Sequence, residues 1–290
     1  MSGPVVERSE VLVPGPAEAL AGLLACDPPD ADGGPLPLLW HTVYLLDRPR
    51  LADLGPDGHP RVGVVPVPPA EGMRRMFAGG RVRLLSPLRL GRPASRRSVV
   101  ASTEVKQGRT GPLTFLTVRH VVTQDGRACV EEEQDLVYRP AGSPPGPPPR
   151  PLEDAPLLAD ERAVPVDPVL LFRFSALTYN GHRIHYDRDY ARDVEGWGGL
   201  VVHGPWQALV MAEAARRLAD GDSGAVQQFA YRLEAPLLDG DGMIVSAVGA
   251  GPETQPAVQC AVRDRSGRRT AFATWTGPAS SPTTTRLEPT

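Results

Sequence analysis

Two runs of β-strands, one on each side of a proline-rich segment, limit the folds that this chain can adopt. The segment RPAGSPPGPPPRP occupies residues 139–151 of 290, close to the middle. Its prolines exclude a helix or an interior strand and favour an extended connector that rises about 3 Å per residue. We therefore expect an N-terminal domain at residues 1–140, a linker at 141–168 and a C-terminal domain at 169–290.

The runs on either side of this segment follow the same plan. RRSVVASTEV, LTFLTVRHVVT and ACVEEEQDLVYR come before it, and FAYRLEAPL, MIVSAVGA, AVQCAVRD and RTAFATWT come after it. Segments rich in β-branched residues and separated by short turns predict antiparallel meanders. RLLSPLRLG in the first half and RLEAPLLDG in the second share Arg, Leu, Pro, Leu and Gly at equivalent positions, which indicates an internal duplication.

One segment, PWQALVMAEAARRLAD at residues 205–220, has the pattern of a long helix. It has a proline in its first turn, apolar residues at helical spacing and arginines near its end. His203 and Gly204 precede it in place of an acidic or amide cap, which leaves backbone N–H groups at the helix start available to a ligand. A curved antiparallel sheet in each half, packed on a central helix, predicts an α+β double hot-dog. Two unrelated sandwiches are the alternative.

Composition argues against several kinds of partner. The formal net charge is -3 and Lys106 is the only lysine, so no basic block is present to attract nucleic acid or an anionic membrane. Cys26, Cys129 and Cys260 are far apart and form no CxxC, so we expect neither a disulfide framework nor a zinc knuckle. No apolar run approaches the ~18 residues of a membrane span, and the N-terminus is unlike a secretory signal. We expect a cytoplasmic protein.

The stretch YNGHRIHYD, at residues 179–187, brings several reactive side chains together. His182 and His185 stand three residues apart, next to an asparagine and a carboxylate. Such a group suits either proton transfer or zinc binding. The helical HExxH spacing of metalloproteases is absent, so we expect no metal here.

This part of the chain resembles the MaoC-like (R)-specific enoyl-thioester hydratases and dehydratases, through FSALTYNGHRIH and the later His-Gly pair. It is most similar to the group of mesaconyl-CoA hydratases and fungal mitochondrial-type hydroxyacyl-thioester dehydratases. LWH, LGPDGHP, RRMFAGG, TGPL and EEQDLVYR in the first half resemble the same group, in the same order. The resemblance implies a hydro-lyase that adds water to, or removes it from, an enoyl thioester of CoA or a carrier protein, without a cofactor.

The resemblance also implies catalytic roles. His185 is the expected acid–base, because a histidine can take a proton from water and return it near neutral pH. Asn180 stands where the wider family has an aspartate, and an amide can orient water but cannot accept its proton. Asp187 or Asp189 would be an alternative carboxylate partner if the segment is extended. The N–H of Gly204 is the expected donor to the thioester oxyanion.

Other residues are expected to bind or support the substrate. We expect His203, Trp197 and Tyr179 to bind it, although His203 is equally compatible with a buried place at the helix entry. His182 is expected to be structural. Because the first half has no counterpart of NGHRIH, we expect it to be a non-catalytic scaffold, with one active site per chain. A homodimer is one expected assembly. A non-catalytic thioester-binding protein and a hot-dog thioesterase are the alternative functions.

Overall fold

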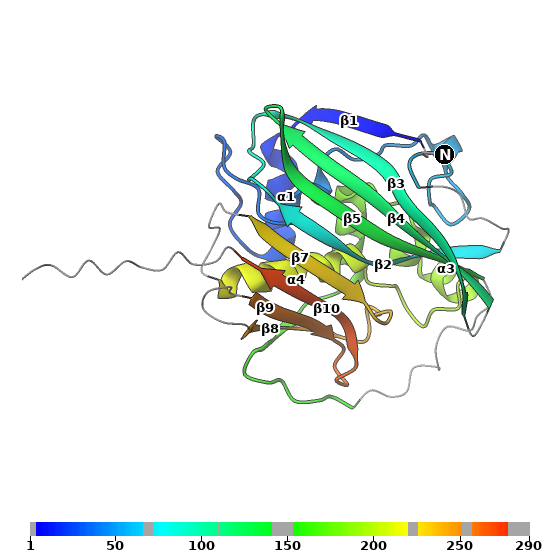
Figure 1. The fold of residues 1–290 in the computed structure, drawn as a ribbon. Helices are drawn as coiled ribbons and strands as arrows, with labels where there is room; N and C mark the ends of the chain where they lie inside the picture. Colours follow the sequence, from blue (N-terminus) through cyan, green and yellow to red (C-terminus); the bar gives the residue numbers. More distant parts are fainter. Residues whose placement is uncertain are drawn as a thin grey trace, which may run out of the picture.

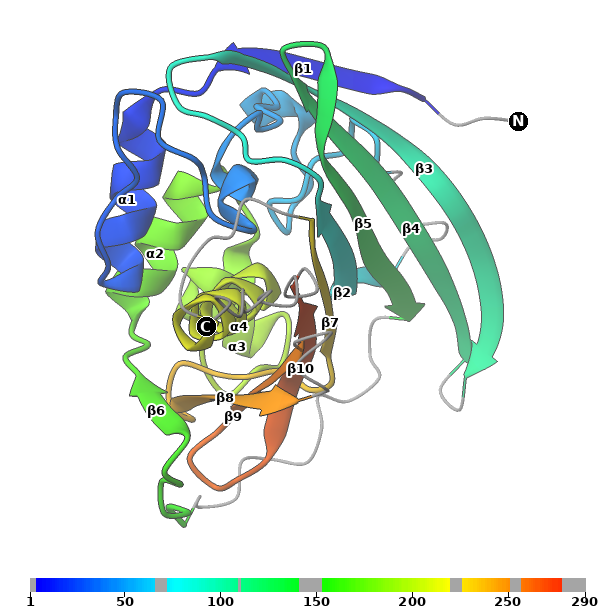
Figure 2. The ribbon, with the colours of Figure 1, turned by 60° about the vertical axis from the view of Figure 1, so that its left-hand side comes forward.

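The computed structural model describes residues 4–65, 72–108, 111–140, 153–219, 226–250 and 257–277. In these ranges ten antiparallel strands form one curved sheet, and the long helix α4 (Gly204–Leu218) lies within its curve (Figures 1 and 2). The strands are β1 Val6–Val11, β2 Met73–Leu84, β3 Pro93–Gly108, β4 Gly111–Gln124, β5 Arg127–Pro140, β6 Glu161–Val164, β7 Gln227–Leu233, β8 Met243–Ala250, β9 Ala257–Arg263 and β10 Arg269–Thr276. The shorter helices are α1 Pro14–Leu24, α2 Pro168–Leu177 and α3 Arg188–Asp193, with 3-10 turns η1 Trp40–Val43, η2 Leu51–Asp53 and η3 Arg183–His185.

The strand order repeats outward from the centre of the sheet. The order is β1-β3-β4-β5-β2-β7-β10-β9-β8-β6, with β2 and β7 paired antiparallel in the middle. Each half therefore contributes the same succession of strands, as an internal duplication requires. This arrangement confirms the predicted double hot-dog, and the predicted strands and long helix are found at their expected places.

The linker predicted at residues 141–168 is only partly visible. Residues 141–152 lie outside the described residues. Beyond them, Glu161–Val164 forms β6 and pairs with β8 at the edge of the sheet. The last part of the predicted linker thus belongs to the sheet of the second half, and both halves share one continuous sheet.

Two glycines allow β2 to lie tightly between β5 and β7. A Cβ on Gly79 would lie 2.4 Å from the backbone carbonyl oxygen of Tyr231, and a Cβ on Gly80 would lie 2.6 Å from the backbone carbonyl oxygen of Glu133. The register of β2 against β5 shifts between Phe77 and Gly79, which marks a bulge. The two glycines of the RRMFAGG motif are therefore needed because the backbones of neighbouring strands approach β2 closely where the two halves join.

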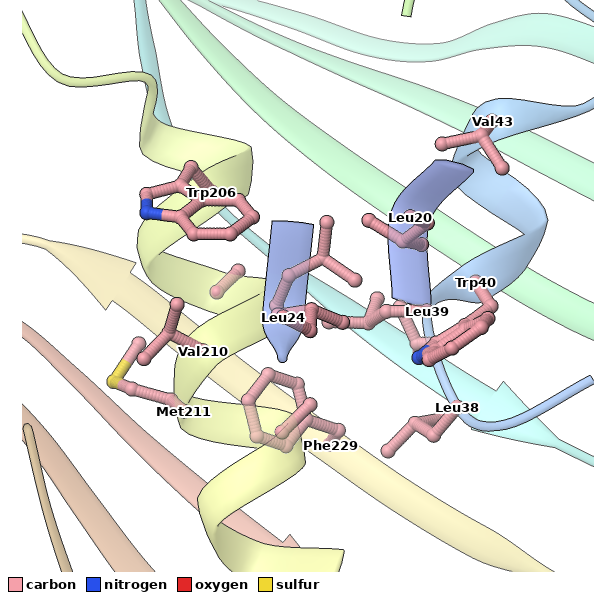
Figure 3. Close-up of a cluster of buried hydrophobic side chains, with 14 of the residues drawn as sticks. Leu20, Leu24, Leu38, Leu39, Trp40, Val43, Trp206, Val210, Met211 and Phe229 are labelled. Atoms are coloured by element: carbon pink, nitrogen blue, oxygen red, sulfur yellow. The ribbon is translucent and has the colours of Figure 1, made fainter. Parts of the chain in front are cut away.

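Helix α4 is the centre of the hydrophobic core. It packs against β8, β9 and β10, and its side chains meet those of α1 and of the segment that leads into η1 (Figure 3). The buried side chains at this junction are Leu20, Leu24, Leu38, Leu39, Trp40, Val43, Trp206, Val210, Met211 and Phe229. Burial of such side chains contributes about 1.5–3 kcal/mol each to folding.

The first half carries no helix as long as α4 among the described residues. Helix α1 contacts mainly α2 and η1, and residues 39–65 are turns and irregular backbone apart from η1 and η2. A buried hydrogen bond holds this segment to the sheet, with 3.1 Å between His41 Nε2 and Glu132 Oε2. Burial opposes ionisation of Glu132, but the hydrogen bond from His41 lowers its pKa to about 2. The irregular segment is thus fixed by a polar contact rather than by a helix.

Part of this segment docks onto the second half through backbone atoms. The N–H of Arg183 donates to the Asp57 carbonyl oxygen at 2.9 Å. Gly58 has a φ of +88°, and a Cβ there would lie 1.8 Å from the carbonyl oxygen of Gly181. Only glycine fits this contact, because both the left-handed conformation and the close approach exclude a side chain.

Gly58→Ala tests this docking. We expect it to lower the free energy of unfolding by about 2–4 kcal/mol, since the new methyl group adds a backbone clash to the left-handed strain. Gly33→Ala is the matched control, because Gly33 has a φ of +82° with nothing within 4 Å of its added Cβ. Gly33→Ala should lower the free energy of unfolding by about 1 kcal/mol, from backbone strain alone. Equal losses of unfolding free energy in the two variants, measured in urea, would show that the contact with Gly181 is not close in solution.

Candidate active site

A cavity of about 1220 Å³ lies between the two halves of the molecule. Its wall includes β2, the start of α4, the irregular segment of the first half and the YNGHRIHYD stretch. Both apolar and polar side chains line it, and these include the expected site residues Tyr179, Asn180, His185, Trp197 and Gly204. A site of this size is large enough for an acyl group and part of its thioester carrier.

His185 reaches the cavity from η3. Its Nδ1 donates a hydrogen bond to the Val201 carbonyl oxygen at 2.7 Å, since a carbonyl can only accept. This bond fixes the tautomer and leaves Nε2 as the unprotonated nitrogen of the neutral ring. Burial lowers the pKa of His185 to about 4. The ring is therefore neutral near pH 7 and can accept a proton at Nε2.

His203 lies behind His185. The two rings stack with their centroids 3.7 Å apart, and His203 Nε2 is 2.8 Å from Ser175 Oγ. The His203 side chain is fully buried and is absent from the cavity wall, which differs from the substrate-binding role expected from the sequence. Its position agrees with the alternative that the sequence left open, a buried place at the helix entry, where the ring packs on His185.

Asn180 shapes the loop as well as the cavity. Its Oδ1 accepts a hydrogen bond from the His182 backbone N–H at 3.0 Å, which leaves its NH₂ group to face other partners. The alternative carboxylates do not reach His185. Asp187 caps α3 and pairs with Arg183, and Asp189 pairs with Arg192. The expectation of a shared face with His185 assumed an extended segment, whereas the chain turns through η3 and α3.

Asp57 and His59, from the first half, were not identified from the sequence. His59 Nδ1 donates to Asp57 Oδ2 at 2.8 Å, and its ring centroid is 3.9 Å from that of His182. The His182 ring is in turn 5.4 Å from that of His185. The available signal was the LGPDGHP motif, in which a carboxylate and a histidine stand two residues apart. The first half therefore adds titratable groups to the cavity, beyond the scaffold role expected of it.

The ionisation of these groups follows from their burial and their pairing. Burial raises the pKa of Asp57, but the hydrogen bond from His59 outweighs it and holds that pKa below its ordinary range. Burial lowers the pKa of His59 and His182, and the nearby guanidinium of Arg75 lowers both further. The cluster at neutral pH is one carboxylate among neutral imidazoles.

Three of these side chains are also spaced closely enough to hold a metal ion. The ligand atoms of Asp57, His59 and His182 lie within 4.8 Å of one another. The charge of Arg75, which already disfavours protonation of both histidines, would equally disfavour a bound cation. The donor set permits a metal, but its electrostatic surroundings oppose one.

Gly204, Trp197 and Tyr179 occupy different parts of the cavity wall. Gly204 is the first residue of α4, and its N–H donates no hydrogen bond within the described residues. Trp197 packs against a small apolar cluster, and its Nε1 is buried without a partner in the described part of the chain. Tyr179 is 55% exposed. A free N–H at a helix start and an unpaired indole N–H are both suited to a polar ligand.

Residues 39–239 match the family model described as hydroxyacyl-thioester dehydratase type 2, which is more than half of the chain. The chain belongs to this family. It is 48% identical over 228 residues to the mesaconyl-C(4)-CoA hydratase of Chloroflexus aurantiacus, covering 77% of this chain and 79% of that protein. It is 24% identical over 219 residues to the mitochondrial hydroxyacyl-thioester dehydratase type 2 of Schizosaccharomyces pombe, covering 68% and 72%.

Solved structures share the fold of this dehydratase-family chain. A MaoC-like dehydratase superposes with a TM-score of 0.67 at 15% identity, covering 96% of this chain and 98% of that one. A Mycobacterium tuberculosis protein described as having a double hotdog fold gives a TM-score of 0.58 at 16% identity, covering 95% and 96%. The resemblance stated from the motifs is confirmed.

Membership of the family makes the protein an enzyme. It is a hydro-lyase that adds water to, or removes water from, the carbon–carbon double bond of an enoyl thioester. Among the described residues, no helix has both the length and the apolar character needed to cross a membrane.

The buried histidines predict how stability depends on pH. The pKa values of His59, His182, His185 and His203 are all lowered, mainly by burial. The unfolded chain therefore binds protons below about pH 6.5 that the folded chain does not, and stability falls as the pH drops from about 7.5 to 5.5.

Urea unfolding at several pH values measures the number of protons taken up. His182→Gln should reduce that number by about one at pH 5.5, since one buried imidazole is lost. Tyr186→Phe, in the same loop, should leave it unchanged. An unchanged proton count in His182→Gln would mean that this imidazole is already protonated in the folded enzyme.

Proposed function

We propose that this enzyme hydrates the double bond of a mesaconyl-CoA-like enoyl thioester, with His185 as the proton carrier. The observation that carries the proposal is the Val201 carbonyl bond, which leaves Nε2 of His185 as the base in a cavity that also contains the free N–H of Gly204. Similarity to the mesaconyl-C(4)-CoA hydratase supports CoA as the carrier and a short acyl group.

The reaction assigns each proton to an atom. Nε2 of His185 takes a proton from water while the water oxygen bonds to the β-carbon. The electrons of the double bond move toward the thioester, and negative charge collects on its oxygen. The N–H of Gly204 and the positive end of the α4 dipole stabilise that charge. His185 then returns the proton to the α-carbon, which gives the 3-hydroxyacyl thioester and restores the neutral ring.

Asn180 and the Asp57–His59 pair support this step. Because Asn180 Oδ1 accepts from His182, its NH₂ group is the part left to donate to the attacking water oxygen. The carboxylate that the wider family carries at this position is present instead as Asp57, separated from His185 by two imidazole rings. Its charge favours the transient positive charge that forms among the histidines. Trp197 and Tyr179 are the proposed walls for the acyl group and the pantetheine arm.

Variants of the loop test the role of His185. His185→Ala should lower kcat by about 10²- to 10⁴-fold without a comparable loss of ligand affinity. His182→Ala should act mainly on stability.

Asn180→Asp should keep substantial activity, whereas Asn180→Ala should lose more activity because the water is no longer held. Abolished turnover in His182→Ala with intact turnover in His185→Ala would refute the assignment, as would loss of activity to a chelator with recovery on added zinc.

The reaction class is tested by following two signals at once. Hydration removes the ultraviolet absorbance of the conjugated enoyl thioester, and a thiol-trapping reagent reports hydrolysis. We expect the absorbance to fall with no thiol released. Thiol release would indicate a thioesterase, and binding without any change would indicate a non-catalytic protein. Comparison of CoA and carrier-protein thioesters tests the carrier.

The cytoplasmic location of the enzyme and its homodimeric assembly remain predictions.

A further inference from the structure

Arg75, on β2, brings an unpaired positive charge into the wall of the cavity. It stands opposite Tyr138 of β5 in the sheet ladder, and the Tyr138 hydroxyl accepts a hydrogen bond from it. Its neighbours on the same face of β2, Met73 and Phe77, pack into an apolar cluster with Tyr138. A guanidinium is therefore held beside an apolar cluster, where a charge without a paired anion is costly.

Four of the six other arginines that line the cavity are paired with carboxylates, and two of them share Asp47. The ion pairs are Arg8–Asp47 at 2.9 Å, Arg48–Glu10 at 3.2 Å, Arg74–Glu195 at 3.0 Å and Arg96–Asp47 at 3.2 Å. No ion pair within the described ranges includes Arg75. The carboxylate whose charge it feels, Asp57, is bonded to His59. The charge of Arg75 is thus available to a ligand.

The position of Arg75 decides which part of a ligand it meets. Arg75 lines the cavity two residues along β2 from Phe77, whose ring lies 3.2 Å from the position of a Cβ on Gly204. Its charge also acts on His182, which is in edge contact with His185. Arg75 therefore lies at the reacting end of the cavity, where the double bond must sit. The phosphates of CoA are a whole pantetheine arm away from that bond. The anion at Arg75 must then belong to the acyl group itself.

We propose that Arg75 binds a carboxylate on the acyl group, so that the preferred substrate is the monothioester of a short unsaturated dicarboxylic acid. This inference rests on the proposed hydratase activity and assigns the residue that selects its substrate. Arginine binds a carboxylate through two parallel hydrogen bonds, which fixes orientation as well as affinity. A substrate with a methyl group in place of the carboxylate leaves Arg75 without an anion, and this disfavours it.

The ion pair also assists the addition of water. A carboxylate next to the β-carbon repels the electron-rich oxygen that attacks that carbon. Arg75 offsets this repulsion and leaves the β-carbon electrophilic. The carboxylate is not consumed, because the hydroxyl group goes to the β-carbon and the proton to the α-carbon.

Two substrates that differ only in this group test the proposal. Mesaconyl-C4-CoA and 3-methylcrotonyl-CoA carry a carboxylate and a methyl group, respectively, at the same position. The wild-type enzyme should prefer the first by about 10²-fold or more in kcat/KM. Arg75→Met should lower kcat/KM for mesaconyl-C4-CoA by about 10²- to 10³-fold and leave 3-methylcrotonyl-CoA unchanged or improved. Equal losses on both substrates would show that Arg75 only supports the fold.

Arg232→Met is the matched control, because Arg232 also lines the cavity but is exposed. It should not change the ratio of the two kcat/KM values. Calorimetry with the saturated pair 3-carboxybutyryl-CoA and isovaleryl-CoA tests the wild-type enzyme without turnover, and the carboxylated ligand should bind at least about 10-fold tighter. Equal affinity would overturn the proposal. If the wild-type enzyme hydrates both enoyl thioesters equally, Arg75 is misassigned while the hydratase stands; if it hydrates no enoyl thioester, the proposed function fails.

Discussion

The antiparallel pairing of β2 with β7 is the contact on which the rest of the structure depends. It joins two five-strand halves into one ten-stranded sheet, and it requires glycine at positions 79 and 80 because the Tyr231 and Glu133 oxygens approach too closely for a side chain. Through this pairing the irregular segment of the first half lies beside the start of α4 in the second. Both segments contribute to the wall of the cavity.

The two halves hold their polar interior by different means. In the second half, burial keeps His185 and His203 neutral, and the Val201 carbonyl and Ser175 hydroxyl orient their rings. In the first half, a buried hydrogen bond between His41 and the Glu132 carboxylate anchors the segment that takes the place of a long helix. The buried rings of His185 and His203 thus meet carbonyl and hydroxyl oxygens, whereas His41 and His59 of the first half each meet a carboxylate.

Much of the fold is encoded in local patterns, which is why it could be predicted. The alternation in β3, β4 and β5 and the apolar stripe of α4 are properties of adjacent residues. The place of His203 is not a local property, because it depends on the packing of its ring against Phe174 of α2. The turn through η3 is not local either, because it depends on the capping of α3 by Asp187. Asp57 and His59 were missed for the same reason. Their meeting with His182 is produced by the contact between Gly58 and Gly181, more than a hundred positions apart, and no local periodicity reports it.

The absence of a second α4 from the described first half makes the two repeats unequal. Residues 39–65 form turns there, and several of them line the cavity. The same turns carry Asp57 and His59 to the ring of His182 in the second half. Any change that returned these residues to a helix would therefore remove part of the cavity wall together with the Asp57–His59 pair.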